Sequence, residues 1–188
     1  ADKTRLLLGL GRIGGEVAKR AAAFDMTILV YDPYLSAEAI AKVGATKVES
    51  WQNVLPNVDI LSIHLPLNDA TRNIINAEVL AAMQPYAVIL NAARGGLIDE
   101  AALYHELSGR MASGGAGIDA FESEPPAMDN PLFSLSNVVL SPHSAAMTEE
   151  SARKMGVVSA LNVIAGLEGT LDPALIFNRQ AIENGMIQ

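Results

Sequence analysis

Residues 4–15 read TRLLLGLGRIGG, an apolar run that leads into a glycine-rich turn and then directly into a segment of helical period. The pattern G-x-G-x-x-G, formed by Gly9, Gly11 and Gly14, predicts a strand-turn-helix unit that binds a dinucleotide. Gly9 permits the tight turn, Gly11 lets the backbone approach a pyrophosphate, and Gly14 lets the helix pack closely on the strand. The N–H groups at the start of this helix would bind the phosphates.

The next apolar run, Thr27–Tyr31, is expected to form a strand that ends at Asp32, directly before Pro33. A carboxylate at this position would accept hydrogen bonds from the adenosine ribose and repel a 2′-phosphate, so the sequence predicts NAD rather than NADP. An aspartate before proline also starts ordinary turns. Folds that bind S-adenosylmethionine share the glycines and the acid, so these residues alone leave a methyltransferase open.

Short apolar runs alternate with helical segments along the rest of the chain, which predicts an α/β fold with a doubly wound parallel sheet of the Rossmann type. We expect a dinucleotide-binding domain over residues 1–169 and a separate C-terminal segment over residues 170–188, which contains the apolar run Ala174–Phe177. The expected strands are Thr4–Leu8, Thr27–Tyr31, Val58–Ile63, Ala87–Asn91, Gly115–Asp119 and Asn137–Leu140. The expected helices are Ile13–Phe24, Ser36–Val43, Ala77–Met83, Glu100–Ser108 and Thr148–Leu167.

The composition excludes several classes of partner. The 188 residues contain 13 Lys and Arg against 21 Asp and Glu, a net charge of -8, so no basic field would attract nucleic acid or an anionic membrane. The absence of cysteine removes thiolate nucleophiles and thiolate metal ligands, and it fits a reducing, cytoplasmic compartment. We also expect no transmembrane segment, because polar residues interrupt every apolar stretch.

Reactive side chains follow several of the expected strands, at the edge where open α/β folds bind ligands. Arg94 follows the strand Ala87–Asn91 and could bind a carboxylate through two hydrogen bonds. His143 follows the strand Asn137–Leu140, and Glu124 could orient its imidazole for acid-base chemistry near neutral pH. An arginine before Gly-Gly is commonly a solvated loop residue and a single histidine is commonly structural. The assignment therefore depends on these side chains meeting in space.

Taken in order, these motifs resemble the NAD-binding domain of the D-isomer-specific 2-hydroxyacid dehydrogenases. The resemblance extends from about Thr4 to Gly169 and is strongest to the phosphoglycerate dehydrogenase and hydroxypyruvate/glyoxylate reductase branches. Besides the glycine turn and Asp32, it is carried by the segments Ser62–Leu67 (SIHLPL), Asn91–Asp99 (NAARGGLID), Gly117–Pro125 (GIDAFESEP) and Ser141–His143 (SPH).

The resemblance implies an oxidoreductase that transfers a hydride between NAD(H) and a 2-hydroxy or 2-keto acid. Arg94 would hold the carboxylate and carbonyl oxygen of the substrate, His143 would protonate that oxygen, and Glu124 would pair with His143. Formate dehydrogenases share the fold but pair their histidine with glutamine. The resemblance further implies that the cofactor is contacted by Gly9, Gly11, Arg12, Ile13, Gly14, Asp32, His64, Leu65, Pro66, Ala92 and Asp119.

Members of this family carry a second domain that closes over the substrate, and this sequence shows no counterpart to it. We therefore expect the chain to be a cofactor-domain fragment in which substrate positioning is weakened more than NAD binding. A homodimer, which the family implies, would have to form without the helix that precedes the first cofactor strand. The alternative is a non-catalytic NAD sensor or corepressor-like interaction module, since one branch of the family regulates transcription.

Overall fold

The strand before the glycine turn, β1 (Thr4–Leu8), lies inside the sheet, and its three leucines are fully buried. It pairs in parallel with β2 (Thr27–Tyr31) on one side and with β4 (Ile60–Ile63) on the other. A strand covered on both faces requires a continuous apolar run, which residues 6–8 provide. The structure, a computed structural model, describes residues 2–176 and 178–179.

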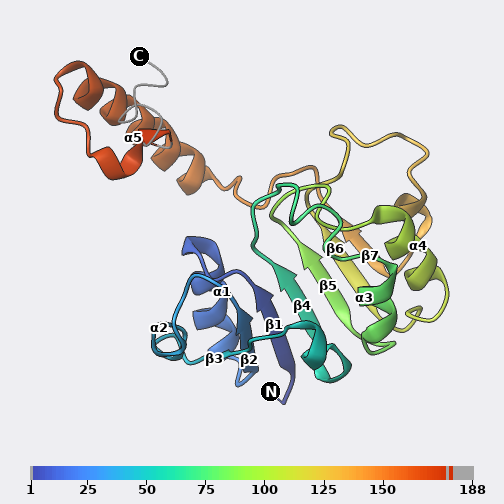
Figure 1. Cartoon of the computed structure of the whole chain (residues 1–188). Coiled ribbons are helices and arrows are strands. Elements are labelled where there is room, and N and C mark those ends of the chain that lie inside the picture. Colours follow the sequence, from blue (N-terminus) through green and yellow to red (C-terminus); the bar gives the residue numbers. More distant parts are fainter. Residues whose placement is uncertain (1, 177, 180–188) are drawn as a thin grey trace. The chain divides into compact units, whose positions relative to one another are not determined.

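In the described part of the chain, seven parallel strands form one sheet in the order β3-β2-β1-β4-β5-β6-β7 (Figure 1). The strands not yet introduced are β3 (Thr46–Lys47), β5 (Val88–Asn91), β6 (Gly115–Ile118) and β7 (Val138–Leu140). The strand order reverses between β1 and β4, and doubly wound sheets bind ligands beyond the carboxyl ends of the strands at such a point. The predicted doubly wound Rossmann-type fold is confirmed.

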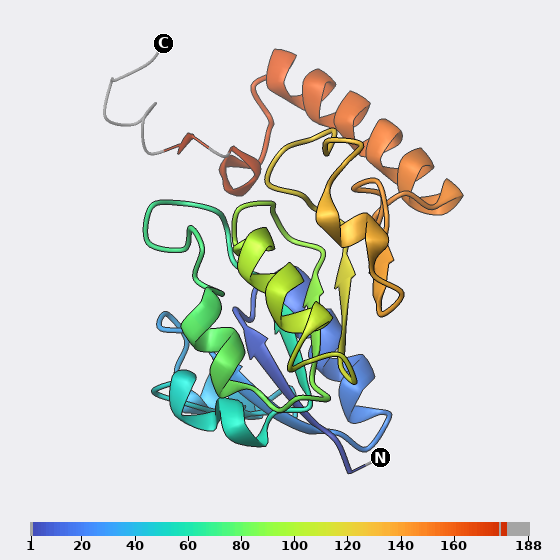
Figure 2. The same cartoon turned by 90° about the vertical axis from the view of Figure 1, so that its right-hand side faces the viewer.

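Two groups of helices cover opposite faces of this sheet (Figures 1 and 2). Leu7 of β1 belongs to the apolar cluster that includes α1 and α2, whereas Leu6 and Leu8 belong to the cluster that includes α3 and α4. Successive side chains of a strand point to opposite faces, so these two clusters are the two sides of one sheet. The helices are α1 (Arg12–Ala22), α2 (Ala37–Ala41), α3 (Ala77–Ala82) and α4 (Glu100–Ser108).

The structure corrects the predicted limits of several strands. Strands β4, β5 and β7 begin one or two residues later than predicted, and β6 ends at Ile118 rather than at Asp119. Before β4, the amide of Val58 donates to the carbonyl of Leu55 and closes a 3₁₀ helix over Gln52–Asn57, so pairing starts only at Ile60. The sequence did not predict β3 or this 3₁₀ helix, because such short segments carry little periodicity.

The helix limits differ from the predictions mainly at residues that cap the ends. Ser36 was predicted to lie inside α2, but its side chain accepts a hydrogen bond from the amide of Ala39 at 3.2 Å and caps the helix. Helix α1 begins one residue earlier than predicted, at Arg12, and ends at Ala22 rather than at Phe24. Helix α4 has the predicted limits, with Asp99 as its cap at 2.9 Å from the amide of Ala102.

The chain divides into two compact units, Ala1–Ala145 and Ala146–Gln188. In the second unit, α5 (Glu149–Leu167) begins after Thr148, whose side chain accepts from the amide of Ser151 at 3.1 Å. The apolar run predicted at Ala174–Phe177 overlaps a 3₁₀ helix over Pro173–Leu175, and Phe177 lies outside the described residues.

Candidate active site

The glycine turn after β1 packs directly against the segment that follows β4. Gly9 has φ +91°, and a Cβ atom at this position would lie 2.8 Å from the carbonyl oxygen of His64. A Cβ at Gly14 would lie 2.5 Å from the carbonyl oxygen of Gly9, so the first turn of α1 also touches the glycine turn. Side chains at either position would separate these segments, as the sequence predicted for a tight turn and a close helix.

The start of α1 is free to accept an anion. Its N-cap is Gly11, which supplies no side-chain hydrogen bond, and a Cβ at this position would meet nothing within 4 Å. The first N–H groups of a helix have no partner within the helix, and they carry partial positive charge. These groups belong to the turn that contains Arg12 and Ile13, and the side chain of Ile13 is 71% exposed. This geometry fits the pyrophosphate of a dinucleotide.

The carboxylate of Asp32 links the end of β2 to the glycine turn. Its Oδ2 accepts a hydrogen bond from the amide of Leu10 at 2.9 Å, and its Oδ1 accepts one from the amide of Tyr34 at 3.0 Å. Each carboxylate oxygen has a further lone pair, so these contacts leave acceptors for ribose hydroxyls. Asp32 therefore shapes the turn and also presents a negative charge where the sequence predicted contact with adenosine.

His64, which follows β4, is half-buried behind the glycine turn. Its Nε2 lies 3.0 Å from the hydroxyl oxygen of Ser62. Burial, together with the positive charge of Arg5, lowers the pKa of His64 to about 4. The imidazole is therefore neutral near pH 7 and contributes hydrogen bonds and surface, not charge. Leu65 and Pro66 continue this segment, and the Leu65 side chain would lie 3.3 Å from a Cβ at Gly9.

A cavity of about 370 Å³ lies on the α1 side of the sheet. It brings together four of the residues predicted to contact the cofactor: Ile13, His64, Ala92 and Asp119. The remaining residues around it are Arg5, Val17, Ser62, Leu90, Gly117, Ile118, Val139, Ser141 and Ala145. The cavity extends from the glycine turn to the end of β6, and most of its surface is apolar, as expected of a site for a flat ring.

His143 and Glu124 meet in the structure, although 19 residues separate them in the sequence. The Nδ1 atom of His143 lies 2.9 Å from both carboxylate oxygens of Glu124. Glu124 also accepts a hydrogen bond from the amide of Phe121 at 3.0 Å. The contact with His143, followed by the Phe121 hydrogen bond, lowers the pKa of Glu124, so the carboxylate is ionised at neutral pH. An ionised partner at Nδ1 leaves Nε2 as the nitrogen that can exchange a proton with a substrate.

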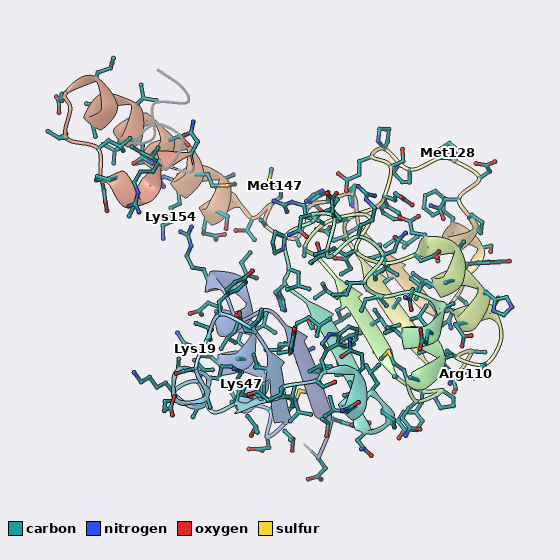
Figure 3. The ribbon with its side chains drawn as sticks, viewed as in Figure 1. Lys19, Lys47, Arg110, Met128, Met147 and Lys154 are labelled. Atoms are coloured by element: carbon teal, nitrogen blue, oxygen red, sulfur yellow. The ribbon has the colours of Figure 1, made fainter. Side chains whose placement is uncertain are left out.

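The loop between β6 and β7 carries Glu124, and it runs outward from the sheet edge. Met128 at the far part of this loop is 92% exposed, and Figure 3 shows it projecting away from the sheet. The loop is anchored to α4, because Glu100 accepts hydrogen bonds from the amide of Glu122 at 2.7 Å and from the side chain of Asn130 at 3.0 Å. The loop is thus held near both of its ends.

Asp119 holds the segment that carries His143. Its buried carboxylate accepts hydrogen bonds from the hydroxyl of Ser141 at 2.5 Å and from the amides of Ser144 and Ala145 at 2.8 and 2.9 Å. Burial alone would raise the pKa of Asp119, but these hydrogen bonds outweigh it and the pKa is lowered. The segment needs such support, because His143 adopts a left-handed backbone conformation with φ +52°.

The turn that carries Arg94 lies against the backbone of the Glu124 loop. Asn91 shapes the turn, because its side chain donates to the carbonyl of Arg94 at 2.8 Å and accepts from the amide of Ala93 at 3.1 Å. A Cβ at Gly95 would overlap the carbonyl group of Phe121, so only glycine permits this approach. The Arg94 side chain is exposed and donates to the carbonyl of Ala93 at 2.6 Å.

Several polar residues of the site were not among those predicted from the sequence. Arg5 interrupts an apolar strand, whereas Ser62 and Asn91 are 4% and 2% exposed within β4 and β5. The signal available in the sequence was a polar residue inside an otherwise apolar strand, because buried polar groups need hydrogen-bond partners. Among residues 2–176 and 178–179, no group of three or more His, Cys, Asp or Glu side chains could hold a metal, and no helix is long and apolar enough to span a membrane.

Comparison with known proteins agrees with this geometry. The chain is 44% identical over 170 residues to a D-3-phosphoglycerate dehydrogenase of Methanocaldococcus jannaschii, covering 90% of this chain and 32% of that protein. It is 45% identical over 158 residues to a hydroxypyruvate reductase of Thermotoga maritima, covering 82% of this chain and 50% of that protein. The chain thus spans about a third to a half of the length of these relatives.

A solved structure of D-lactate dehydrogenase with NAD+ from Lactobacillus jensenii superposes with a TM-score of 0.80 at 34% identity, covering 89% of this chain and 53% of that one. Residues 1–145 match the NAD-binding domain of the D-isomer specific 2-hydroxyacid dehydrogenases. A methyltransferase, which the glycines and Asp32 alone left open, is thereby replaced by a dehydrogenase cofactor domain. The chain belongs to the D-isomer specific 2-hydroxyacid dehydrogenase family, of which it contains the NAD-binding domain.

Proposed function

We propose that this chain is the cofactor domain of an enzyme that transfers a hydride between NAD(H) and a D-type 2-hydroxy or 2-keto acid. The contact at 2.9 Å between Nδ1 of His143 and the carboxylate of Glu124 carries this proposal. An ionised carboxylate at Nδ1 suits an acid-base catalyst, because the carboxylate fixes the tautomer of the imidazole and stabilises the imidazolium. The relatives described above, which are dehydrogenases and a reductase, agree with this chemistry.

The residues around the glycine turn would hold the cofactor. We assign the pyrophosphate to the backbone of Gly9, Gly11 and Gly14 with Arg12 and Ile13, and the adenosine ribose to Asp32. The segment His64, Leu65 and Pro66 would line the path of the adenosine and phosphates, while Ala92 and Asp119 would lie beside the nicotinamide. The cavity shared by Ile13, His64, Ala92 and Asp119 supports the nicotinamide part of this assignment.

The proton and the substrate would be handled by three side chains. Bound NADH would supply the hydride to the carbonyl carbon of the keto acid. His143, held at Nδ1 by Glu124, would donate a proton from Nε2 to the carbonyl oxygen, which gives the hydroxy acid; in the reverse direction His143 would accept that proton. Arg94 would bind the substrate carboxylate and stabilise the negative charge that develops on the carbonyl oxygen.

Substrate closure would require the second domain that members of this family carry. We propose that residues 1–169 form the dinucleotide-binding domain and that the segment from residue 170 returns to the substrate domain. Closure would exclude water and orient the keto acid. We further propose that the protein is a homodimer that binds a small 2-hydroxy or 2-keto acid. We place it in the cytoplasm, because a cysteine-free composition suits a reducing compartment. Its acidic composition offers no basic surface for nucleic acid.

The test is oxidation of NADH by this chain joined to its substrate domain, with hydroxypyruvate, glyoxylate and phosphohydroxypyruvate as substrates. Turnover with at least one of them, lost in His143→Ala, would support the proposal. The 188-residue chain alone should bind NADH and turn over far more slowly. NADH binding without turnover of any of the three acids would favour the NAD sensor or corepressor-like module.

A further inference from the structure

Arg5 places a positive charge beside the cavity on the α1 side of the sheet. It lies in β1, two residues before Leu7, so both side chains project from the same face of the sheet. The Arg5 side chain is half-buried and borders the same cavity as Ile13, Ala92 and Asp119. The positive charge of Arg5 therefore borders the cavity that we propose for the nicotinamide ring.

This guanidinium has no counter-charge in the described part of the chain. Its Nε atom is fully buried and has no hydrogen-bond partner. None of the ion pairs among residues 2–176 and 178–179 includes Arg5. Burial lowers the pKa of Arg5, yet an arginine remains protonated in proteins, so the charge persists at neutral pH. A poorly hydrated charge is also weakly screened.

The other titratable groups at the cavity do not cancel this charge. His64 is neutral near pH 7, because burial and Arg5 lower its pKa to about 4. Asp119 is negative, but its carboxylate accepts hydrogen bonds from Ser141, Ser144 and Ala145 and forms no ion pair with Arg5. Among residues 2–176 and 178–179, the buried Nε of Arg5 finds no such hydrogen-bond partner.

The two redox states of the cofactor differ by one charge at the ring. The nicotinamide ring is positive in NAD+ and uncharged in NADH, whereas the rest of the molecule is the same. We infer that Arg5 lowers the affinity of this domain for NAD+ relative to NADH and so selects the redox state of the bound cofactor. This inference rests on the proposed function, because it requires that the nicotinamide ring occupies the cavity.

The size of the cavity sets the scale of the effect. A sphere of 370 Å³ is about 9 Å across, and two unit charges at that separation, with an effective dielectric constant of about 20, change an affinity about 20-fold. Partial exposure of Arg5 to water reduces this value, so we expect a factor of about ten. For a two-electron couple, a tenfold change in the affinity ratio corresponds to about 30 mV in the potential of the bound cofactor.

The experiment measures the dissociation constants of NADH and NAD+ for the 188-residue chain by fluorescence and calorimetry. Arg5→Met removes the charge and keeps an unbranched side chain of similar length, whereas Arg5→Lys keeps the charge. We expect the ratio Kd(NAD+)/Kd(NADH) to fall about tenfold in Arg5→Met and to stay within about twofold in Arg5→Lys. The matched control is Arg20→Met, because Arg20 lies on α1 and its exposed side chain pairs with Glu16; it should leave the ratio unchanged.

The outcomes separate this inference from the proposed function. If the parent chain binds no NADH, the cofactor assignment and the inference both fail. If NADH binds but Arg5→Met leaves the ratio unchanged, the inference alone is overturned. Arg5→Gln provides a second neutral variant, measured in the same way, in case Arg5→Met does not fold.

Discussion

Replacing Gly95 with alanine tests whether the approach between the Arg94 turn and the Glu124 loop sets the geometry of the site. A Cβ at residue 95 would overlap the carbonyl group of Phe121 and would lie only 2.8 Å from the amide nitrogen of Glu122. Non-bonded heavy atoms normally stay about 3.5–4.0 Å apart, so one of the two backbones must move by roughly 1–2 Å. The amide of Phe121 donates to Glu124, and the shift would therefore reach the carboxylate that holds His143.

Two measurable consequences follow for Gly95→Ala. Overpacking of this kind costs about 1–3 kcal/mol, which lowers the melting temperature of a domain this size by about 2–12 °C. A displacement of about 1 Å costs about 100-fold in rate, so kcat/KM of the chain joined to its substrate domain should fall by about that factor. The affinity for NADH should change less than about threefold, because the glycine turn is not part of this contact.

Circular dichroism of the 188-residue chain gives the melting temperature, and NADH oxidation gives the rate. The matched control is Gly156→Ala in α5, where a Cβ would meet nothing within 4 Å and where alanine favours the helix. A Gly95→Ala variant with unchanged melting temperature and unchanged kcat/KM would refute the argument that this glycine fixes the site.

The other predictions concern the acid-base pair and the adenosine end. His143→Ala should lower kcat by about 10²- to 10⁴-fold while NADH affinity, measured by fluorescence titration, stays nearly constant; parallel loss of both would contradict the assigned role. Asp32→Ala should weaken NADH binding and reduce discrimination against NADPH, and it should also loosen the glycine turn, because the Leu10 amide loses its acceptor; unchanged dissociation constants for both dinucleotides would exclude Asp32 from the site. The lowered pKa of Glu124 means that its contribution to stability is present above its unfolded-state pKa and is lost as pH falls through the folded-state pKa. Urea unfolding of Glu124→Gln and the parent chain should therefore differ more at pH 7 than in acid, and a difference that grows in acid would reverse the sign we assign.

The sequence was most informative where one segment contains all the information that shapes it. The strand Thr4–Leu8 and the helix Glu100–Ser108 were predicted with their observed limits, because an apolar run and a capped helical segment are both local signals. The two residues of β3 become a strand only by pairing with Leu29 and Val30, so no local pattern could reveal them.

The contact between His143 and Glu124 was predictable from the sequence, but the hydrogen bonds that support it were not. His143 and Glu124 were named as a pair, and the structure places them together. Composition and spacing could not show that Asp119 anchors the segment around His143, because those hydrogen bonds join amides 25 and 26 residues away along the chain. The need for glycine at Gly95 likewise arises from the approach of a distant backbone.

The left-handed backbone conformation of His143 lowers the stability of the fold at the residue proposed to transfer the proton. An L-amino acid in this conformation costs roughly 1–2 kcal/mol relative to its preferred one, a cost that glycine escapes. A selection for thermal stability alone would consequently enrich glycine or asparagine at this position. The selected variants would be more stable but would lack the imidazole. Stabilising libraries built on this domain should therefore hold residue 143 fixed.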